Sequence, residues 1–273
     1  MKPLMSRFAP SPTGDLHLGH AYSALCAWQA AGQSARYFKL RIDDLDFTRC
    51  KDEFVQRQID DLKWLGVAWQ DPPLFQSKRF SRYQEALEQL KDQQLIYPCY
   101  LSRKEVNEIL SAPQATSSLR DALPLEETDK RQEAGNQPAW RLDMRRIKQI
   151  TPELTWHDDY HGTQFVDLNL IGDAVIARRD IGTSYHLSVI FDDADSNIEM
   201  IVRGRDLLAE TGIQRLLQFL FALPTPRYAH HALIVDDQGK RLAKRDDART
   251  IRSFREAGFS PSELFDLCEN SKE

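Results

Sequence analysis

The segment from residue 4 to residue 20 most constrains how this chain can fold. Residues 4–9 form a short apolar run typical of a strand, and the Pro and Gly residues of 10–14 force an irregular turn. Apolar residues then recur at helical spacing until Gly32, and residues 36–42 are typical of a second strand. Strand, helix and strand in this order predict a βαβ unit, and therefore an α/β fold with a parallel sheet.

Further elements follow the same alternation. A helix is predicted over residues 52–65, strands over 139–144, 164–169 and 232–235, and a closing helix at Pro261. Three capping-box patterns predict additional helix starts, namely Ser81-x-x-Gln84, Ser102-x-x-Glu105 and Thr211-x-x-Gln214. The polar stretch 111–137 has little periodicity, which predicts an exposed insertion or mobile loop.

Composition excludes several classes of protein. The 273 residues, 41% of them hydrophobic, suffice for one large domain or a domain with an insertion. Neither a membrane span of about 20 apolar residues nor the apolar core of a secretory signal occurs, so we expect a cytoplasmic protein without membrane partners. The net charge of -5 weighs against a nucleic-acid partner, although a local basic patch could serve one.

Two histidines stand where the first turn becomes a helix. A helix N-terminus attracts phosphate, and His17 and His20, one turn apart, add hydrogen-bond donors at the same point. Gly19 between them leaves room for a flat ring against the backbone. The alternatives are a surface histidine pair without a ligand, or a zinc site, for which no third ligand stands nearby.

Two charged clusters follow predicted strands. Asp43, Asp44 and Asp46 come directly after residues 36–42, where ligands of parallel sheets bind, and could hold an ammonium group or a magnesium ion. The cations of 240–245 suit a triphosphate or an RNA backbone. Each cluster alone could also be a solvated surface.

Taken together and in order, these motifs resemble the catalytic domain of class I glutamyl-tRNA synthetases. The similarity spans nearly the whole chain and is weakest over 111–137. Its motifs are residues 7–14, the HIGH-like His17-Leu18-Gly19-His20, Arg41-Ile42-Asp43-Asp44-Leu45-Asp46, Tyr185-His186-Leu187 with Asp192-Asp193, Ile201-Val202-Arg203-Gly204-Arg205-Asp206, and the KMSKS-like Arg241-Leu242-Ala243-Lys244-Arg245.

The resemblance implies a class I aminoacyl-tRNA synthetase fold. A Rossmann-like parallel sheet is expected from residues 1–100 and 170–235, with an inserted α+β acceptor-type subdomain over 101–169 that contains a polar loop at 111–137. Residues 236–273 are expected to hold the KMSKS-like loop and a short helical C-terminal segment.

The resemblance also implies activation of L-glutamate by ATP with Mg²⁺, and transfer of the glutamyl group to tRNA. His17, His20 and Lys244 would be catalytic. Arg7 and Tyr185 would bind the side-chain carboxylate and Arg203 the α-carboxylate. Ala9, Ser11 and Asp43 would bind the amino group, with Phe8 and Pro10 completing the glutamate pocket. The ATP site would comprise His17, Gly19, His20, Gly204, Asp206, Arg241, Leu242 and Lys244.

Length separates subgroups of this family. Glutamyl-tRNA synthetases continue into an anticodon-binding domain, whereas this chain ends 28 residues after Arg245, so we expect no such domain. A short paralogue that attaches glutamate to queuosine in the anticodon of tRNA(Asp) fits this length, and we expect a monomer. On that reading the series Arg249, Arg252 and Arg255 faces the anticodon stem-loop, although a solvated helix face is an equal alternative.

Two further classes remain as alternatives. One is a shortened glutamyl-tRNA synthetase, or a glutamate activator with another acceptor such as a carrier protein. The other is a non-catalytic RNA-binding paralogue, which the presence of His17, His20 and Lys244 disfavours.

The chain departs from the family pattern at several positions. Asp43 replaces a Glu, which withdraws the carboxylate by on the order of 1 Å, and Arg241 and Ala243 replace the Lys and Ser of the KMSKS loop. The subgroup often carries a zinc site that begins Cys-x-Cys, where this chain has Cys99-Tyr100-Leu101. One thiolate cannot hold zinc, so we expect no structural zinc and no protein metal site.

Overall fold

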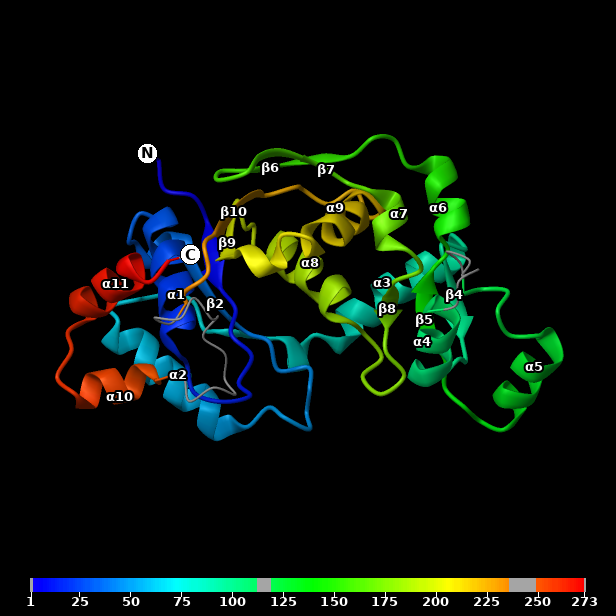
Figure 1. Cartoon of the computed structure of the whole chain (residues 1–273), viewed down its shortest axis with the longest axis horizontal. Coiled ribbons are helices and arrows are strands. Elements are labelled where there is room, and N and C mark those ends of the chain that lie inside the picture. The colour runs from blue at the N-terminus through cyan, green and yellow to red at the C-terminus, as the bar shows by residue number, and fades with distance from the viewer. Residues whose placement is uncertain (1, 112–118, 236–248, 273) are drawn as a thin grey trace.

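A computed structural model describes residues 2–111, 119–235 and 249–272 of the chain. Over these residues, the main element is a seven-stranded sheet of order β3-β2-β1-β9-β10-β6-β7 (Figure 1). Its neighbours are parallel except in the β6–β7 hairpin. The strands are β1 (Ser6–Phe8), β2 (Phe38–Ile42), β3 (Leu74–Phe75), β6 (Thr155–Asp158), β7 (Gly162–Phe165), β9 (Met200–Gly204) and β10 (Arg227–His231). The predicted parallel α/β class is confirmed.

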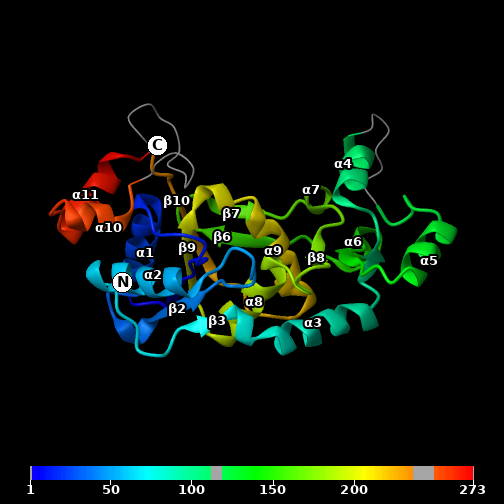
Figure 2. The same ribbon diagram turned by 90° about the horizontal axis from the view of Figure 1, so that it is seen from below.

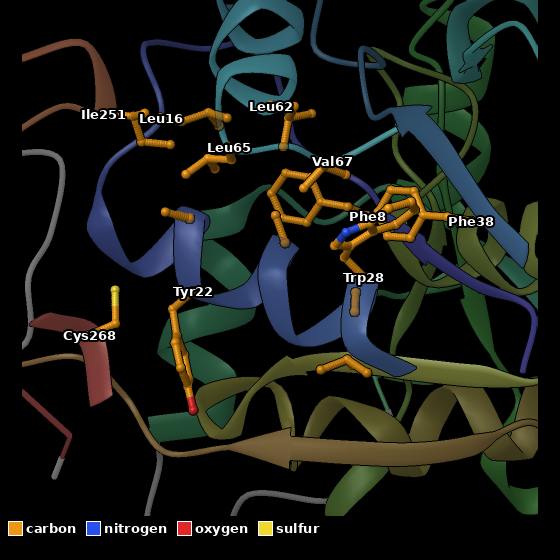
Figure 3. Close-up of a cluster of buried hydrophobic side chains, with 14 of the residues drawn as sticks. Phe8, Leu16, Tyr22, Trp28, Phe38, Leu62, Leu65, Val67, Ile251 and Cys268 are labelled. Carbon is orange, nitrogen blue, oxygen red and sulfur yellow. The ribbon is translucent and has the colours of Figure 1, made fainter. Parts of the chain in front are cut away.

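Helix α1 packs on β1 and β9 through a stripe of buried apolar side chains (Figure 3). Trp28 meets Phe38 edge-to-face with ring centroids 5.4 Å apart, and burial of each such side chain contributes about 1.5–3 kcal/mol. The helices next to this sheet are α1 (Leu18–Ala30), α2 (Asp52–Trp64), α8 (Tyr185–Asp195) and α9 (Glu210–Leu220), with short 3-10 turns η1 (Ala35–Tyr37), η2 (Gln76–Lys78) and η3 (Arg205–Leu207).

A second module extends from one end of the molecule (Figures 1 and 2). Its three-stranded antiparallel sheet has the order β4-β5-β8 within the described residues. Its elements are α3 (Phe80–Asp92), β4 (Ile96–Cys99), α4 (Arg103–Ser111), α5 (Leu125–Glu133), β5 (Ala139–Leu142), α6 (Met144–Ile150), α7 (Leu168–Ile171) and β8 (Val175–Ala177). A core that includes Leu142, Ile176, Ile190 and Leu216 joins it to α8 and α9.

The boundaries of this module differ from the expected 101–169. Strands β4 and β8 lie outside that range yet form the small sheet, whereas β6 and β7 lie inside it and extend the large sheet. Trp156 of β6 is the physical reason, because it packs with Ile198, Ile201 and Tyr228 in a buried cluster beside β10. Its ring centroid lies 5.2 Å from that of Tyr228.

The stretch 111–137 is not a loop throughout, since it contains helix α5; residues 112–118 lie outside the described part of the chain. No residue of helix α5 is buried, and this explains why the sequence of the helix shows only weak apolar periodicity. Charge supports it instead: Arg131 bonds Glu127 at 2.7 Å one turn away and Glu105 of α4 at 2.8 Å. The hydrogen bonds from Arg131 and Ser102 lower the pKa of Glu105 to about 2.

The strand predicted over 232–235 was misplaced. Strand β10 ends at His231, and Ile234 makes only an isolated bridge to Lys272. The sequence Arg-Tyr-Ala-His-His looks too polar for a buried strand, yet His230 and His231 are 1% and 4% exposed. Their polar partners, described below, permit this burial.

Of the capping boxes, Ser102–Glu105 is confirmed by reciprocal hydrogen bonds of 2.6 and 3.2 Å. The boxes at Ser81 and Thr211 are wrong, because these residues are not N-caps but the second residues of α3 and α9, which begin at Phe80 and Glu210.

The C-terminal part consists of α10 (Ile251–Glu256) and α11 (Pro261–Asn270), with Pro261 in the first turn as expected. Helix α11 packs on α1, and Cys268 is fully buried there. No helix among the described residues combines the length and apolar character that crossing a membrane requires.

Candidate active site

A cavity of about 440 Å³ opens at the carboxyl ends of the central strands. Phe8 ends β1, Asp43 follows β2, Gly204 ends β9 and His231 ends β10, and all four line the cavity. Open parallel sheets bind their ligands at this edge.

The cavity brings together every described residue that the family resemblance assigned to catalysis or substrate binding. They are Arg7, Phe8, Ala9, Pro10, Ser11, His17, Gly19, His20, Asp43, Tyr185, Arg203, Gly204 and Asp206. Asp44 and Asp46 of the acidic cluster do not line it, because Asp44 bonds Ser77 and Asp46 bonds Thr48. The other predicted residues, Arg241, Leu242 and Lys244, lie outside the described residues. The wall also contains residues that the sequence did not single out, namely Ser23, Arg41, Val202, Leu207, His231, Leu233 and Ile234.

The two histidines form the capping box of α1. His17 Nδ1 accepts from the Gly19 backbone N–H at 3.2 Å, and His20 Nδ1 accepts from the His17 N–H at 3.2 Å. Their ring centroids are 3.7 Å apart. Because each Nδ1 accepts, each neutral ring carries its proton on Nε2. Both imidazoles can therefore donate from Nε2 at the N-terminus of α1.

The ring of His17 fills part of the space next to Gly19. A Cβ at this position would lie 3.2 Å from Cε1 of His17. Gly19 also lines the cavity, and its lack of a Cβ admits the ring of His17, whose Nδ1 accepts from the Gly19 N–H.

Hydrogen bonds from three parts of the chain hold the irregular turn before α1. Gln58 of α2, fully buried, donates to the carbonyls of Gly14 at 2.8 Å and Ser11 at 3.2 Å. The backbone N–H of Asp43 donates to the Pro10 carbonyl at 3.0 Å. From the C-terminal part, Ile251 N–H donates to the Leu16 carbonyl at 2.9 Å. Each bond satisfies backbone groups that no helix or strand pairs.

A buried ion network lies beneath the cavity. Asp193 of α8 accepts from Arg7 Nε at 3.1 Å and from Arg41 Nη1 at 2.7 Å. Arg41 also donates through Nε to Asp43 at 2.7 Å. Burial opposes ionisation of Asp193, but the two guanidiniums outweigh it and lower its pKa. For Asp43 burial prevails over the charge of Arg41, and its pKa is raised.

Arg41 lines the cavity and bonds Asp43 and Asp193, but sequence reasoning did not name it as a site residue. It stands in the motif that was recognised, and the signal was an arginine between two apolar residues of a strand, Leu40 and Ile42. Such a residue is almost never buried without a partner.

Arg203 of β9 also lines the cavity. Its Nη1 donates to the Tyr185 hydroxyl at 3.4 Å, and its Nη2 donates to Thr211 Oγ1 at 2.7 Å. The Thr211 that resembled a helix cap is instead buried and holds this guanidinium. Four interactions in all, including those with His230 and the Leu207 carbonyl, fix its plane.

The arginine series near the C-terminus is partly engaged within the chain. The Arg249 guanidinium lies 4.1 Å from the centroid of the Phe254 ring, and Arg255 Nη1 lies 4.0 Å from Asp61. Burial raises the pKa of Asp61 to about 6.

Within the described residues, no group of three or more His, Cys, Asp or Glu side chains is arranged to hold a metal ion. The four cysteines are free thiols, and burial raises the pKa of Cys26 to about 11.

Comparison with known proteins agrees with this architecture. The family model of the catalytic domain of class I tRNA synthetases (E and Q) matches residues 3–270. In structure, the chain superposes on glutamate-tRNA synthetase of Elizabethkingia anophelis with a TM-score of 0.79 and 26% identity, covering 95% of this chain and 60% of that one.

Curated relatives fall into two groups. Glutamate–tRNA ligase of Synechococcus sp. (strain JA-3-3Ab) is 37% identical over 94% of this chain, which spans only 54% of its length. Glutamyl-Q tRNA(Asp) synthetases of Rhodobacter capsulatus and Nocardia farcinica are 40% and 38% identical, and the match covers 98% and 83% of their lengths. The chain therefore belongs to the class I tRNA synthetase (E and Q) family, and within it to the short glutamyl-Q tRNA(Asp) synthetases.

Proposed function

We propose that this chain activates L-glutamate with ATP, with no tRNA required, and transfers the glutamyl group to queuosine in the anticodon of tRNA(Asp). Family membership makes it an ATP-dependent ligase of the glutamate-tRNA ligase type. The observation that carries the finer proposal is the near-complete overlap with the relative from Rhodobacter capsulatus, 98% of whose length is matched.

Activation needs no protein nucleophile. The α-carboxylate of glutamate attacks the α-phosphorus of ATP, the bond to the β-phosphate oxygen breaks, and pyrophosphate leaves with that electron pair. The protein contributes positioning and stabilisation of the charge that grows on the phosphates. His17 and His20 suit the second task, because their Nε2–H groups add to the positive end of α1. Lys244 would add a cation from the KMSKS-like loop.

The part of the cavity lined by Arg7, Tyr185 and Arg203 suits a dicarboxylate. Arg7 uses Nε and Nη2 to bond Asp193, which leaves Nη1 to donate to the side-chain carboxylate together with the Tyr185 hydroxyl. Arg203 would take the α-carboxylate, and Asp43, with Ala9 and Ser11, the ammonium group. Two anchored guanidiniums recognise carboxylates by geometry as well as charge.

ATP would bind between α1 and the end of β9, against Gly19, Gly204 and Asp206, with Arg241 and Leu242 from the KMSKS-like loop. Mg²⁺ would enter with the nucleotide, whose phosphates would hold it, and would neutralise part of their charge.

The test of activation is glutamate-dependent exchange of labelled pyrophosphate into ATP without tRNA. We expect exchange with glutamate and far less with aspartate, whose carboxylates cannot reach both guanidiniums. If glutamate supports no exchange, the proposed activity is wrong.

The test of the acceptor is charging of tRNA(Asp) purified with and without queuosine. We expect glutamyl transfer only to the queuosine-containing tRNA. Exchange combined with charging that ignores queuosine would support a shortened glutamyl-tRNA synthetase instead, and exchange without charging of any tRNA would favour another acceptor.

Gly204→Ala tests the ATP pocket. A Cβ at Gly204 would lie 2.5 Å from Asp206 Oδ1 and 3.1 Å from Leu233 Cδ2, so the cavity wall must shift. We expect the KM for ATP in the exchange reaction to rise about tenfold, a loss of about 1.4 kcal/mol of binding. Gly212→Ala is the matched control, because nothing lies within 4 Å of its added Cβ. An unchanged KM for ATP in Gly204→Ala would contradict this assignment.

A further inference from the structure

A buried pair of titratable side chains stands directly behind Arg203. Asp158 ends β6 and His230 lies in β10, and both side chains are 0% exposed. His230 Nδ1 and Asp158 Oδ2 are 2.6 Å apart. Neither residue lines the cavity, so the chemistry proposed above does not use them.

Both oxygens of the Asp158 carboxylate accept hydrogen bonds. Oδ1 accepts from the backbone N–H groups of Tyr160 at 2.9 Å and His161 at 3.0 Å. Oδ2 accepts from the backbone N–H of His230 at 3.1 Å in addition to its ring. Although burial alone would raise the pKa of Asp158, these hydrogen bonds lower it. The carboxylate is therefore ionised and fixed in orientation.

This carboxylate sets the tautomer of His230. With its proton on Nδ1, directed at Asp158, the neutral ring has a lone pair on Nε2. Arg203 Nε, which can only donate, lies 3.0 Å from that Nε2. Burial and the charge of Arg203 lower the pKa of His230 to about 4, so the ring stays neutral near pH 7.

We propose that Asp158 and His230 are positioning residues for glutamate recognition, holding the Arg203 guanidinium in the plane that presents it to the α-carboxylate. The chain of donors and acceptors runs from backbone N–H groups through Asp158 and His230 to Arg203. Parallel pairing of the strands, with His230 opposite Arg203, keeps it in register. This inference rests on the proposed binding of glutamate by Arg203.

The decisive variant is Asp158→Asn, which preserves volume but replaces one acceptor oxygen of the carboxylate by a donor group. When its oxygen accepts from Tyr160 and His161, its NH₂ group faces the backbone N–H of His230, which loses its acceptor, and His230 Nδ1, which must then accept. The ring proton moves to Nε2, where it opposes the N–H of Arg203 Nε. We expect the KM for glutamate in the exchange reaction to rise about ten- to a hundredfold, with the KM for ATP nearly unchanged. Asp159→Asn, the neighbouring exposed carboxylate paired with Arg227, is the matched control.

Nitrogen-detected NMR of the imidazole rings reports the mechanism independently of activity. We expect the unaltered protein to show His230 as the neutral Nδ1–H tautomer at pH 7, and Asp158→Asn to show the Nε2–H tautomer. His230→Gln places an amide oxygen near the Nε2 position, so its KM for glutamate should lie closer to that of the unaltered protein than the KM of His230→Leu does.

The outcomes separate the two proposals. An Nε2–H tautomer in the unaltered protein, or an unchanged KM for glutamate in a folded Asp158→Asn variant, would overturn the positioning role. Equal KM values for His230→Gln and His230→Leu would do the same. Absence of glutamate-dependent exchange in the unaltered protein would instead reject the proposed function, while the tautomer would still test the buried pair.

Discussion

Replacing Arg203 by lysine is expected to lower kcat/KM for glutamate in pyrophosphate exchange by about 100- to 1000-fold. Loss of one partner in a buried, hydrogen-bonded charge pair costs about 2–5 kcal/mol, and each 1.4 kcal/mol is tenfold. Lysine keeps the charge, so the expected loss comes from geometry. The guanidinium makes bonds with His230, Tyr185 and Thr211 through separate nitrogens, whereas an ammonium group at the end of a flexible chain cannot reproduce the planar arrangement.

Arg227→Lys in β10 is the matched control for that variant. Arg227 is exposed, pairs with Asp159 at 2.7 Å and does not line the cavity. It should leave exchange unchanged. If Arg203→Lys exchanged pyrophosphate with glutamate as efficiently as the control, Arg203 would not bind the substrate.

Replacing Asp193 by asparagine is expected to lower the free energy of unfolding by about 3–5 kcal/mol at pH 7, the cost of breaking a buried ion pair. Asp193 is the shared partner of Arg7 and Arg41, and its side chain is 6% exposed. In the variant, the buried side chains of Arg7 and Arg41 lose their shared carboxylate. Arg41 keeps its bond to Asp43. The NH₂ group of the asparagine also opposes a guanidinium donor. Thermal unfolding should show a fall in Tm of roughly 10 °C for a chain of this size.

The pH dependence of this loss follows from the direction of the pKa shift. Arg7 and Arg41 lower the folded-state pKa of Asp193 below its usual value of about 3.9. The stability that the carboxylate contributes is therefore fully present above about pH 4, and is lost as the pH falls through the lower folded-state pKa. The difference between the unaltered protein and Asp193→Asn should persist at pH 5 to 7 and shrink in more acidic solution.

Asp195→Asn, on the same helix, is the appropriate comparison for stability. Asp195 is 35% exposed at its side chain and bonds Arg79 and Arg82, so water can replace its contacts. Its loss should stay within about 1 kcal/mol. Equal destabilisation by the two variants in urea titrations would show that the buried network does not need Asp193.

The parallel α/β fold could be predicted from sequence because its signals are local. The strand, the Pro and Gly turn, and the apolar helix within residues 4–32 each occupy a continuous segment. The closing helix at Pro261 and the helix over Asp52–Trp64 followed the same way. Predictions failed where tertiary contacts overrode composition: Thr211 bonds Arg203 instead of capping a helix, and two histidines occupy a buried strand.

The sequence by itself determined which chemical groups this protein can use: two histidines at a helix start, arginines 7 and 203, and acids that follow strands. Those residues could be named because each stands in a short ordered motif. Only the tertiary structure decided how they are held, since their partners are far away along the chain. Asp193 lies 186 residues from Arg7, and His230 lies 72 residues from Asp158. Sequence patterns report periodicity over a few turns, whereas pairing of buried charges depends on strand register and sheet order, which only the folded chain specifies.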